Sequence, residues 1–187
     1  MKFPIAIALL TLPLVVACET VDDGAGSSGT AGLEVRMSKV TESGVGEPIG
    51  LIVLSDTSAG LGVTVDLRGL PAGARGFHIH EKGDCSPAMR DGKPVAALAA
   101  GGHYDSAASG RHEGPHGQGH TGDLPALSVD ERGEAKITVT APRLTLKEVR
   151  GRSIMIHEGG DNYSDQPKPL GGGGARIACG VIPLEGQ

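Results

Sequence analysis

Seven histidines lie on two short apolar segments, and in the region between them, of this 187-residue sequence. In the first segment His78 and His80 alternate with Phe77 and Ile79. A β-strand directs alternate side chains to opposite faces, so the apolar side chains can enter a core while both imidazoles point outward as metal ligands. In the second segment the same rule points His157 outward, next to two isoleucines that face the core.

The region between these segments adds more groups that can bind a metal ion. They are His103, His112, His116, His120 and Asp123. A single surface histidine is usually only solvated, but several histidines gathered on two strands and one loop indicate a metal site. Imidazole-rich sites suit copper or zinc, and three histidines with one carboxylate suit tetrahedral zinc.

Apolar residues at every second position predict the β-strands that must position these ligands. The predicted strands lie at residues 33–37, 50–54, 61–67, 75–80, 135–139, 153–157 and 176–182. Glycine supplies 31 residues, which weakens helices and suits turns. Short strands separated by glycine and proline favour an antiparallel sandwich or barrel.

Two stretches, residues 81–123 and 158–174, are too long to be plain turns. Long loops in a compact domain are usually functional. The formal charge of −5 leaves no basic stripe for a phosphate backbone, which argues against nucleic-acid binding. Aromatic residues are only 2% of the chain, which argues against an aromatic-lined pocket.

The N-terminus is typical of a targeting segment. Lys2 precedes an apolar run that ends at Ala17 and is shorter than the ~20 residues of a membrane-spanning helix. The run ends in Val-Val-Ala-Cys, which resembles the lipobox of bacterial lipoproteins and predicts cleavage before Cys18 with lipid on its thiol. An ordinary signal peptide is the alternative. Residues 1–17 are therefore the predicted signal peptide, 18–32 a flexible linker and 33–187 the folded domain.

The remaining cysteines, Cys85 and Cys179, form an even pair once Cys18 carries lipid. Outside the cytosol such a pair predicts a disulfide bond. Closing a loop of about 90 residues stabilises the fold by about 4–5 kcal/mol in the chain-entropy model. Two free buried thiols are the alternative.

Five segments together resemble the copper/zinc superoxide dismutases in their bacterial periplasmic form. They are residues 76–81 (GFHIHE), 101–105 (GGHYD), 119–125 (GHTGDLP), 155–165 (MIHEGGDNYSD) and 172–182 (GGGARIACGVI). The resemblance extends over residues 33–184. It implies an all-β fold, an eight-stranded antiparallel Greek-key β-barrel, with long metal-binding and active-site loops outside the barrel wall.

The resemblance also implies one copper and one zinc ion per subunit. The implied copper ligands are His78, His80, His103 and His157. The implied zinc ligands are His103, His112, His120 and Asp123, so that one imidazole, that of His103, is shared. Asp161 corresponds to a carboxylate that accepts hydrogen bonds from the zinc ligand His112 and from one copper ligand, His78 or His80. His116 matches no ligand position.

The implied activity is the conversion of superoxide into oxygen and hydrogen peroxide while copper alternates between Cu(II) and Cu(I). Because the chain is acidic overall, Arg176 is expected to focus the field locally and to hydrogen-bond the anion. His103 is expected to leave copper on its reduction and to supply a proton to the departing peroxide. Lys93 and Lys168 are left open as further cations that steer superoxide.

The main alternative is a non-enzymatic periplasmic lipoprotein that binds or buffers copper on the same barrel. Metal storage needs neither Arg176, Asp161 nor a shared His103, and a purely structural barrel would not need seven histidines so arranged. The predicted location is the periplasmic side of a bacterial cell envelope, with a lipid anchor at Cys18. Glu19 is not the Asp associated with inner-membrane retention, which favours the outer membrane. The sequence leaves monomer and homodimer open.

Overall fold

A computed structural model describes Met1 and residues 32–186 of the chain. Nearly all of its regular structure is β, and three short helical segments lie in the connections between strands. These segments are η1 (Leu98–Ala100), α1 (Leu146–Val149) and η2 (Leu170–Gly172). The predicted signal peptide and linker, with Cys18, lie outside the described residues, apart from Met1 and residue 32. Within the described part, no helix is both long and apolar enough to span a membrane.

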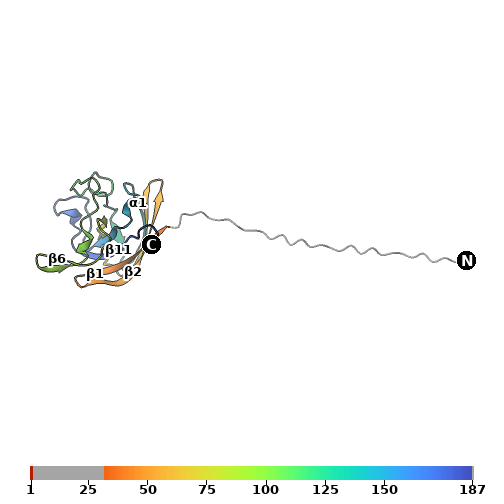
Figure 1. Cartoon of the computed structure of the whole chain (residues 1–187), viewed down its shortest axis with the longest axis horizontal. Coiled ribbons are helices and arrows are strands. Elements are labelled where there is room, and N and C mark those ends of the chain that lie inside the picture. The colour runs from red at the N-terminus through yellow and green to blue at the C-terminus, as the bar shows by residue number, and fades with distance from the viewer. Residues whose placement is uncertain (2–31, 187) are drawn as a thin grey trace.

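Seven strands form one curled antiparallel sheet in the order β5-β10-β11-β1-β2-β3-β9 (Figure 1). Their bounds are β1 (Leu33–Thr41), β2 (Gly44–Thr57), β3 (Gly60–Leu67), β5 (Phe77–His80), β9 (Ala135–Ala141), β10 (Ser153–His157) and β11 (Arg176–Val181). Two antiparallel pairs complete the β structure. They are β4 (Gly73–Arg75) with β8 (Leu127–Val129), and β6 (Ala88–Arg90) with β7 (Lys93–Val95).

The predicted period-two pattern is confirmed in the strands that form the core. The alternating apolar residues of β3 are all buried, between β2 on one side and β9 on the other. The same core receives Phe77 and Ile79 of β5 and the two isoleucines of β10. Burying these apolar faces holds β5 and β10 next to each other, with their opposite faces turned outward.

The strand prediction differs from the structure in several places: β6, β7 and β8 are not predicted, and β1, β2 and β9 are longer than predicted. The strand predicted at residues 75–80 is divided at Gly76, whose N–H donates to the carbonyl of Gly159 (2.8 Å) and not to a ladder partner. The resemblance implied eight barrel strands, whereas the main sheet has seven and two further antiparallel pairs lie outside it. β2 is longer than predicted because pairing with β1 and β3 extends it beyond its apolar centre. β8 was not predicted, since three residues are too few to show a period.

The two predicted long loops fold over the outer face of β5, β10 and β11. The first contains the β6–β7 hairpin, at the left of Figure 1, and η1. The second contains η2. The predicted disulfide is confirmed: Cys85 of the first loop is bonded to Cys179 of β11, with the two Cα atoms 5.8 Å apart. This bond ties the first loop to the barrel wall.

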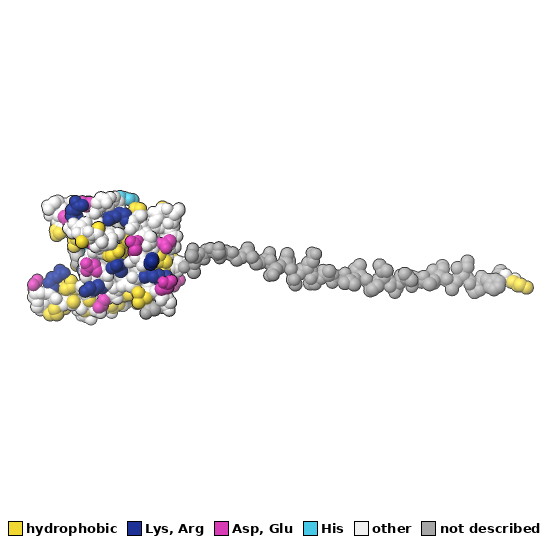
Figure 2. All heavy atoms as spheres, turned by 45° about the horizontal axis from the view of Figure 1, so that its top comes forward, with side chains coloured by type: hydrophobic (Ala, Val, Ile, Leu, Met, Phe, Trp, Pro, Cys, Tyr) yellow, Lys and Arg dark blue, Asp and Glu magenta, His cyan; other side chains and the backbone are white. Residues whose placement is uncertain are grey.

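The surface carries both signs of charge. On the face shown in Figure 2, the Lys and Arg side chains of the described residues are interspersed with Asp and Glu. Exposed ion pairs such as Lys39–Glu47 (2.6 Å) belong to this mixed surface. Pairs of this kind add little to stability.

Candidate metal centre

Three of the predicted ligands lie on the outer face of the barrel wall. His78 and His80 alternate on β5, and His157 ends β10. The strands are in register with Met155 opposite His78 and Ser153 opposite His80, so all these side chains share one face. The outward direction was predicted correctly. The histidines are nevertheless buried, because both long loops cover this face.

The first loop places His103 and Asp123 next to β5 through two isolated antiparallel bridges. One bridge pairs His80 with His103, and the other pairs His78 with Asp123. The rings of His78 and His103 stack with their centroids 3.9 Å apart. One nitrogen from each of His78, His80, His103 and His157 lies within 4.8 Å of the others.

The hydrogen bonds of this first cluster, His78, His80, His103 and His157, decide which nitrogen of each ring is free. His80 Nδ1 donates to the carbonyl of Gly101 (3.0 Å), and His157 Nδ1 donates to that of Gly174 (3.2 Å). Their Nε2 atoms then carry lone pairs and face each other at 3.4 Å. Two facing lone pairs repel, and a cation bound between them would remove that repulsion.

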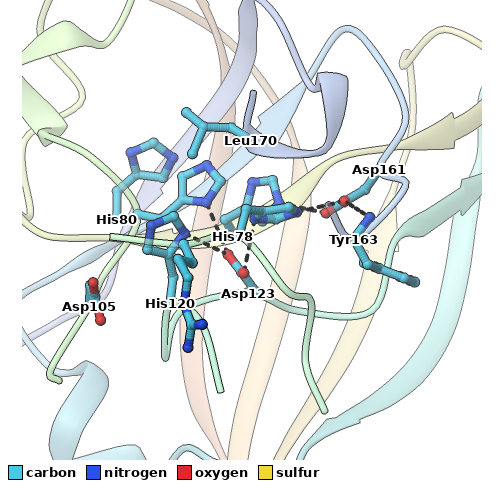
Figure 3. Close-up of polar contacts among 12 residues, drawn as sticks. His78, His80, Asp105, His120, Asp123, Asp161, Tyr163 and Leu170 are labelled. Carbon is cyan, nitrogen blue, oxygen red and sulfur yellow. Dashed lines mark hydrogen bonds and ion pairs between the residues drawn. The ribbon is translucent and has the colours of Figure 1, made fainter. Parts of the chain in front are cut away.

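Asp161 joins the two halves of the centre from the second loop. Its Oδ2 accepts from His78 Nε2 (2.8 Å) and its Oδ1 accepts from His112 Nε2 (2.7 Å) (Figure 3). Of the two copper-side partners left open by the sequence, the structure has His78. These bonds leave Nδ1 of both rings buried and without a hydrogen-bond partner.

Gly171 leaves the space in which the Asp161 carboxylate contacts the His112 ring. It has a positive φ of 67°, and a Cβ at this position would lie 2.1 Å from Asp161 Oδ1 and 2.8 Å from His112 Nε2. A larger residue would therefore push the carboxylate off the imidazole. The glycine run near this position serves the geometry of the site.

A second group of donors surrounds Asp123. Its Oδ1 lies 3.0 Å from His103 Nδ1, and its Oδ2 lies 2.9 Å from His112 Nδ1. His120 Nδ1 is farther away, at 3.6 Å from Oδ1. The tightest four-residue group on this side consists of His78, His103, His112 and Asp123, without His120. His112 Nδ1, His120 Nδ1 and Asp123 Oδ2 are all buried and close together, but their angles do not make well-directed hydrogen bonds.

The imidazoles of the first cluster are held in their neutral form. Burial, together with the charges of neighbouring histidines, places the pKa values of His80 and His157 well below their ordinary value. Burial and the charge of His78 lower the pKa of His103 to about 4. Neutral rings at physiological pH present lone pairs to a metal without first losing a proton.

The groups around Asp123 are charged instead of neutral. Burial lowers the pKa of His112, but hydrogen bonds and charges from Asp123 and Asp161 outweigh it and raise that pKa to about 9. Burial raises the pKa of Asp123, but hydrogen bonds from three histidines outweigh it and hold it well below its ordinary value. The pKa of Asp161 is lowered in the same way, mainly by His112 and His78. Before a metal binds, this side therefore resembles a buried ion pair.

A cavity of about 170 Å³ opens beside three histidines of the first cluster. Its lining includes His80, His103, His157, Leu170 and Arg176. The Arg176 guanidinium donates to the carbonyls of residues 97 and 101, which fixes it next to the imidazoles. A small anion entering this cavity would meet a fixed positive charge on one side and the histidine cluster on the other.

Comparison with known proteins gives this arrangement a family. The sequence profile of the family described as copper/zinc superoxide dismutase (SODC) matches residues 49–182. The Cu-Zn superoxide dismutase 2 of Salmonella typhimurium is 59% identical over 150 residues, covering 80% of this chain and 87% of the relative. The chain belongs to the copper/zinc superoxide dismutase family.

Two solved structures of this family resemble the fold described above. The Cu/Zn superoxide dismutase of Brucella abortus gives a TM-score of 0.79 at 51% identity, covering 80% of this chain and 97% of that one. The solution structure of the monomeric copper, zinc superoxide dismutase of Salmonella enterica gives 0.74 at 58% identity, covering 81% and 99%.

Arg90 is a residue of this superoxide dismutase that the sequence reasoning missed. It ends β6, lines the same cavity, and lies close enough for its charge to add to burial in lowering the pKa of Arg176. The sequence carried a signal for it. Asp91-Gly92, with φ values of 52° and 74°, is the dipeptide preferred in two-residue hairpin turns, and it folds Arg90 back against Lys93.

The other open residues lie away from the clusters. His116 is exposed and belongs to neither group of possible metal ligands among the described residues. Lys93 and Lys168 are exposed, and neither is among the residues that line the cavity. The proposal that they steer superoxide stays a prediction.

Proposed function

We propose that this chain is a cell-envelope superoxide dismutase whose two metals share His103. The enzyme converts two superoxide anions and two protons into oxygen and hydrogen peroxide, and its metals are copper and zinc. The observation that carries the residue assignment is the set of buried, unpartnered ligand atoms facing one another on both sides of His103. A buried polar atom without a partner is costly unless something binds it.

The proposed copper ligands are the four histidines of the first cluster: His78 through Nδ1, and His80, His103 and His157 through Nε2. Hydrogen bonds to Asp161, Gly101 and Gly174 engage the opposite nitrogen of three of these rings, which fixes each tautomer with a lone pair toward the cluster. The fourth, His103, has an unpartnered Nε2 on this side and Nδ1 toward Asp123. One ring therefore presents a nitrogen to each metal.

The proposed zinc ligands are His103, His112, His120 and Asp123. His78 is closer to this group than His120, but its Nε2 already donates to Asp161 and its Nδ1 belongs to the copper set. His120 Nδ1 is buried, unpartnered and 3.6 Å from Asp123 Oδ1, so a small movement of the loop completes a set of three nitrogens and one oxygen. Zinc prefers such a tetrahedral set.

When bound, copper supplies one-electron redox chemistry and zinc supplies a fixed positive charge that stabilises the shared imidazole in its deprotonated form. Arg176 binds the superoxide anion at the mouth of the cavity and orients it toward the histidines. His103 Nε2 would be a copper ligand on this side, and as the nitrogen nearest the cavity it would also be placed to hold a proton for the departing peroxide. Leu170 and the loop around it limit access of water.

The alternative, a copper-buffering lipoprotein, is tested by metal content and dismutation measured on one sample of the full chain. The proposal expects one copper and one zinc per chain and rapid removal of superoxide. A chain that binds copper without dismutation would support buffering. The enzyme is favoured because storage would use neither the fixed Arg176 nor the bridging position of Asp161.

We also propose that lipid on Cys18 holds the chain at the periplasmic side of the envelope, with the outer membrane favoured by Glu19. The apolar run that ends at Ala17 and the disulfide, which suits an oxidising compartment, support this location. In Cys18→Ser, an active enzyme should move from the membrane fraction to the soluble periplasmic fraction. A homodimer is not required for the chemistry, because both clusters form within one chain.

A further inference from the structure

Asp165 joins the two loops of the centre through their backbones. Its Oδ2 accepts from the backbone N–H of His112 (2.9 Å), and its Oδ1 accepts from the backbone N–H of Leu170 (3.0 Å). His112 is a proposed zinc ligand, whereas Leu170 lines the copper cavity. One carboxylate thus connects the zinc side of the centre to the mouth of the cavity, and neither the proposed ligand sets nor the anion-binding role uses it.

Leu170 needs such a support. Its φ is +54°, in the left-handed region that a leucine rarely adopts without an external constraint. Its side chain is 41% exposed and lies above the imidazoles on the cavity side (Figure 3). The hydrogen bond from its N–H to Asp165 holds the backbone in this conformation, so losing that bond would free the apolar wall of the cavity.

The other oxygen of the Asp165 carboxylate, Oδ2, contacts His112. The imidazole of His112 is fixed by Asp161 and Asp123, and its backbone N–H is fixed by Asp165. The ring and the backbone of this one residue are therefore held by different acidic residues. A change that fixes the His112 ring therefore also restrains the His112 backbone. Through the backbone N–H of His112, it also restrains the carboxylate of Asp165.

We propose that Asp165 is a positioning residue that couples zinc binding at His112 to the apolar wall formed by Leu170. With His112 held by zinc, Asp165 keeps Leu170 over the cavity, water is limited, and an anion there feels Arg176 more strongly in the lower dielectric. With His112 loose, Asp165 and Leu170 loosen together. This inference rests on the proposed assignment of His112 to the zinc set.

The test uses azide, a small monovalent anion, on the copper-loaded full chain with and without zinc. The azide Kd is read from the copper absorption spectrum for the wild type, Asp165→Ala and Asp130→Ala. Asp130 is a matched control, because its Oδ1 also accepts from two backbone N–H groups, those of Arg132 (2.9 Å) and Glu134 (2.8 Å), in a turn remote from the centre.

Removing zinc should weaken azide binding in the wild type and in Asp130→Ala by roughly tenfold, the scale of lost charge-assisted hydrogen bonds. Asp165→Ala with zinc should bind azide about as weakly as the wild type without zinc, and zinc should change its Kd little. An equal dependence on zinc in Asp165→Ala and the wild type would overturn the inference. If zinc changes the azide Kd of neither protein, the inference is also wrong; the zinc content of His112→Ala then separates the two failures, because a variant that still binds one zinc would show that the proposed zinc set itself is wrong.

Asp165→Asn is the second test variant, for use if the alanine variant does not fold. An amide oxygen can accept one of the two N–H groups, but the amide nitrogen cannot accept the other. This variant should therefore show an azide Kd and a zinc dependence between those of the wild type and of Asp165→Ala. An Asp165→Asn chain identical to the wild type in both measurements would contradict the positioning role.

Discussion

The two sides of His103 are built from different parts of the fold. On the copper side, His78, His80 and His157 stand on strands whose ladder hydrogen bonds fix their backbones. On the zinc side, all the proposed ligands come from the first loop, which is held by the disulfide, isolated bridges and single backbone hydrogen bonds rather than by a continuous ladder. We therefore expect the strands to preform three of the proposed copper ligands, whereas His120, at 3.6 Å from Asp123, should move most when a metal binds.

The two sides also differ in charge. Burial keeps the copper-side rings neutral, whereas two carboxylates keep His112 protonated up to a pKa of about 9. A metal can therefore bind the copper side without displacing protons at neutral pH, but the zinc side must lose one first. The predictions below test this difference, from the largest expected effect to the smallest.

His157→Ala should abolish dismutation, by about a thousandfold or more, because a ligand of the redox metal is lost. The barrel should still fold, since the apolar residues of β10 that pack in the core are unchanged. Dismutation rate, copper content and circular dichroism check this together. A folded variant with near-wild-type activity would remove His157 from the copper set.

Asp123→Ala should lower zinc affinity by about a hundredfold or more and reduce the melting temperature, because metal that binds only the folded state stabilises it. His116→Ala is the control, since His116 is an exposed histidine of the same loop outside both clusters. Zinc content and melting temperature are compared at equal copper loading. Loss of zinc in His116→Ala with retention in Asp123→Ala would contradict the ligand assignment in this loop.

Zinc affinity should depend on pH with a predictable sign. The pKa of His112 is raised to about 9 in the folded chain without zinc. Its proton therefore stabilises that folded state fully below pH 6.5, and this stabilisation is lost as the pH rises through 9. In the copper-free chain zinc must displace that proton while His103 keeps one of its own, so zinc affinity should rise about tenfold per pH unit, or roughly a hundredfold from pH 6 to 8. Chelator competition measures this slope. Affinity that does not change with pH would mean that His112 is neutral before zinc binds.

Arg176→Ala should lower dismutation by about tenfold or more at low ionic strength and leave both metals bound, because the fixed guanidinium attracts the anion. Its rate should also depend less on salt than that of the wild type. Rates measured over a series of salt concentrations check both points. Unchanged activity at low ionic strength would rule out the guidance role of Arg176.

Arg90→Ala should have the smallest effect, about two- to threefold in rate, because Arg90 is exposed and its charge is better screened than that of Arg176. Metal content and melting temperature should not change. Lys93→Ala, on the facing strand of the same hairpin, is the matched control. A larger loss in Lys93→Ala than in Arg90→Ala would show that the hairpin directs the other cation toward superoxide.

The sequence predicted most of the barrel because its physical signal is local. Alternation of buried and exposed residues in β3 and β5 needs only neighbours in sequence, and it survives in the structure. The break at Gly76 and the three-residue β8 depend on contacts with distant segments, so no local period marks them.

The same distinction applies to the site. Residue types and spacing indicated a metal site on two strands and one loop, whereas the division of its histidines into two ligand sets came from the family resemblance. They could not choose His78 over His80 as the partner of Asp161, because that choice depends on how two rings are rotated beneath a covering loop. Arg90 was missed although Asp91-Gly92 marked its hairpin, since the approach to Arg176 depends on how that hairpin folds back over the wall.

The central claim is that one imidazole, that of His103, connects both metals. The most direct measurement is the copper electron paramagnetic resonance spectrum of the full chain with Co²⁺ in place of zinc. A shared imidazole couples the two paramagnetic ions, so the copper signal should be largely lost when Co²⁺ enters the zinc set. A copper signal of full intensity, with one Co²⁺ bound per chain, would contradict the shared ligand and with it the joined metal centre.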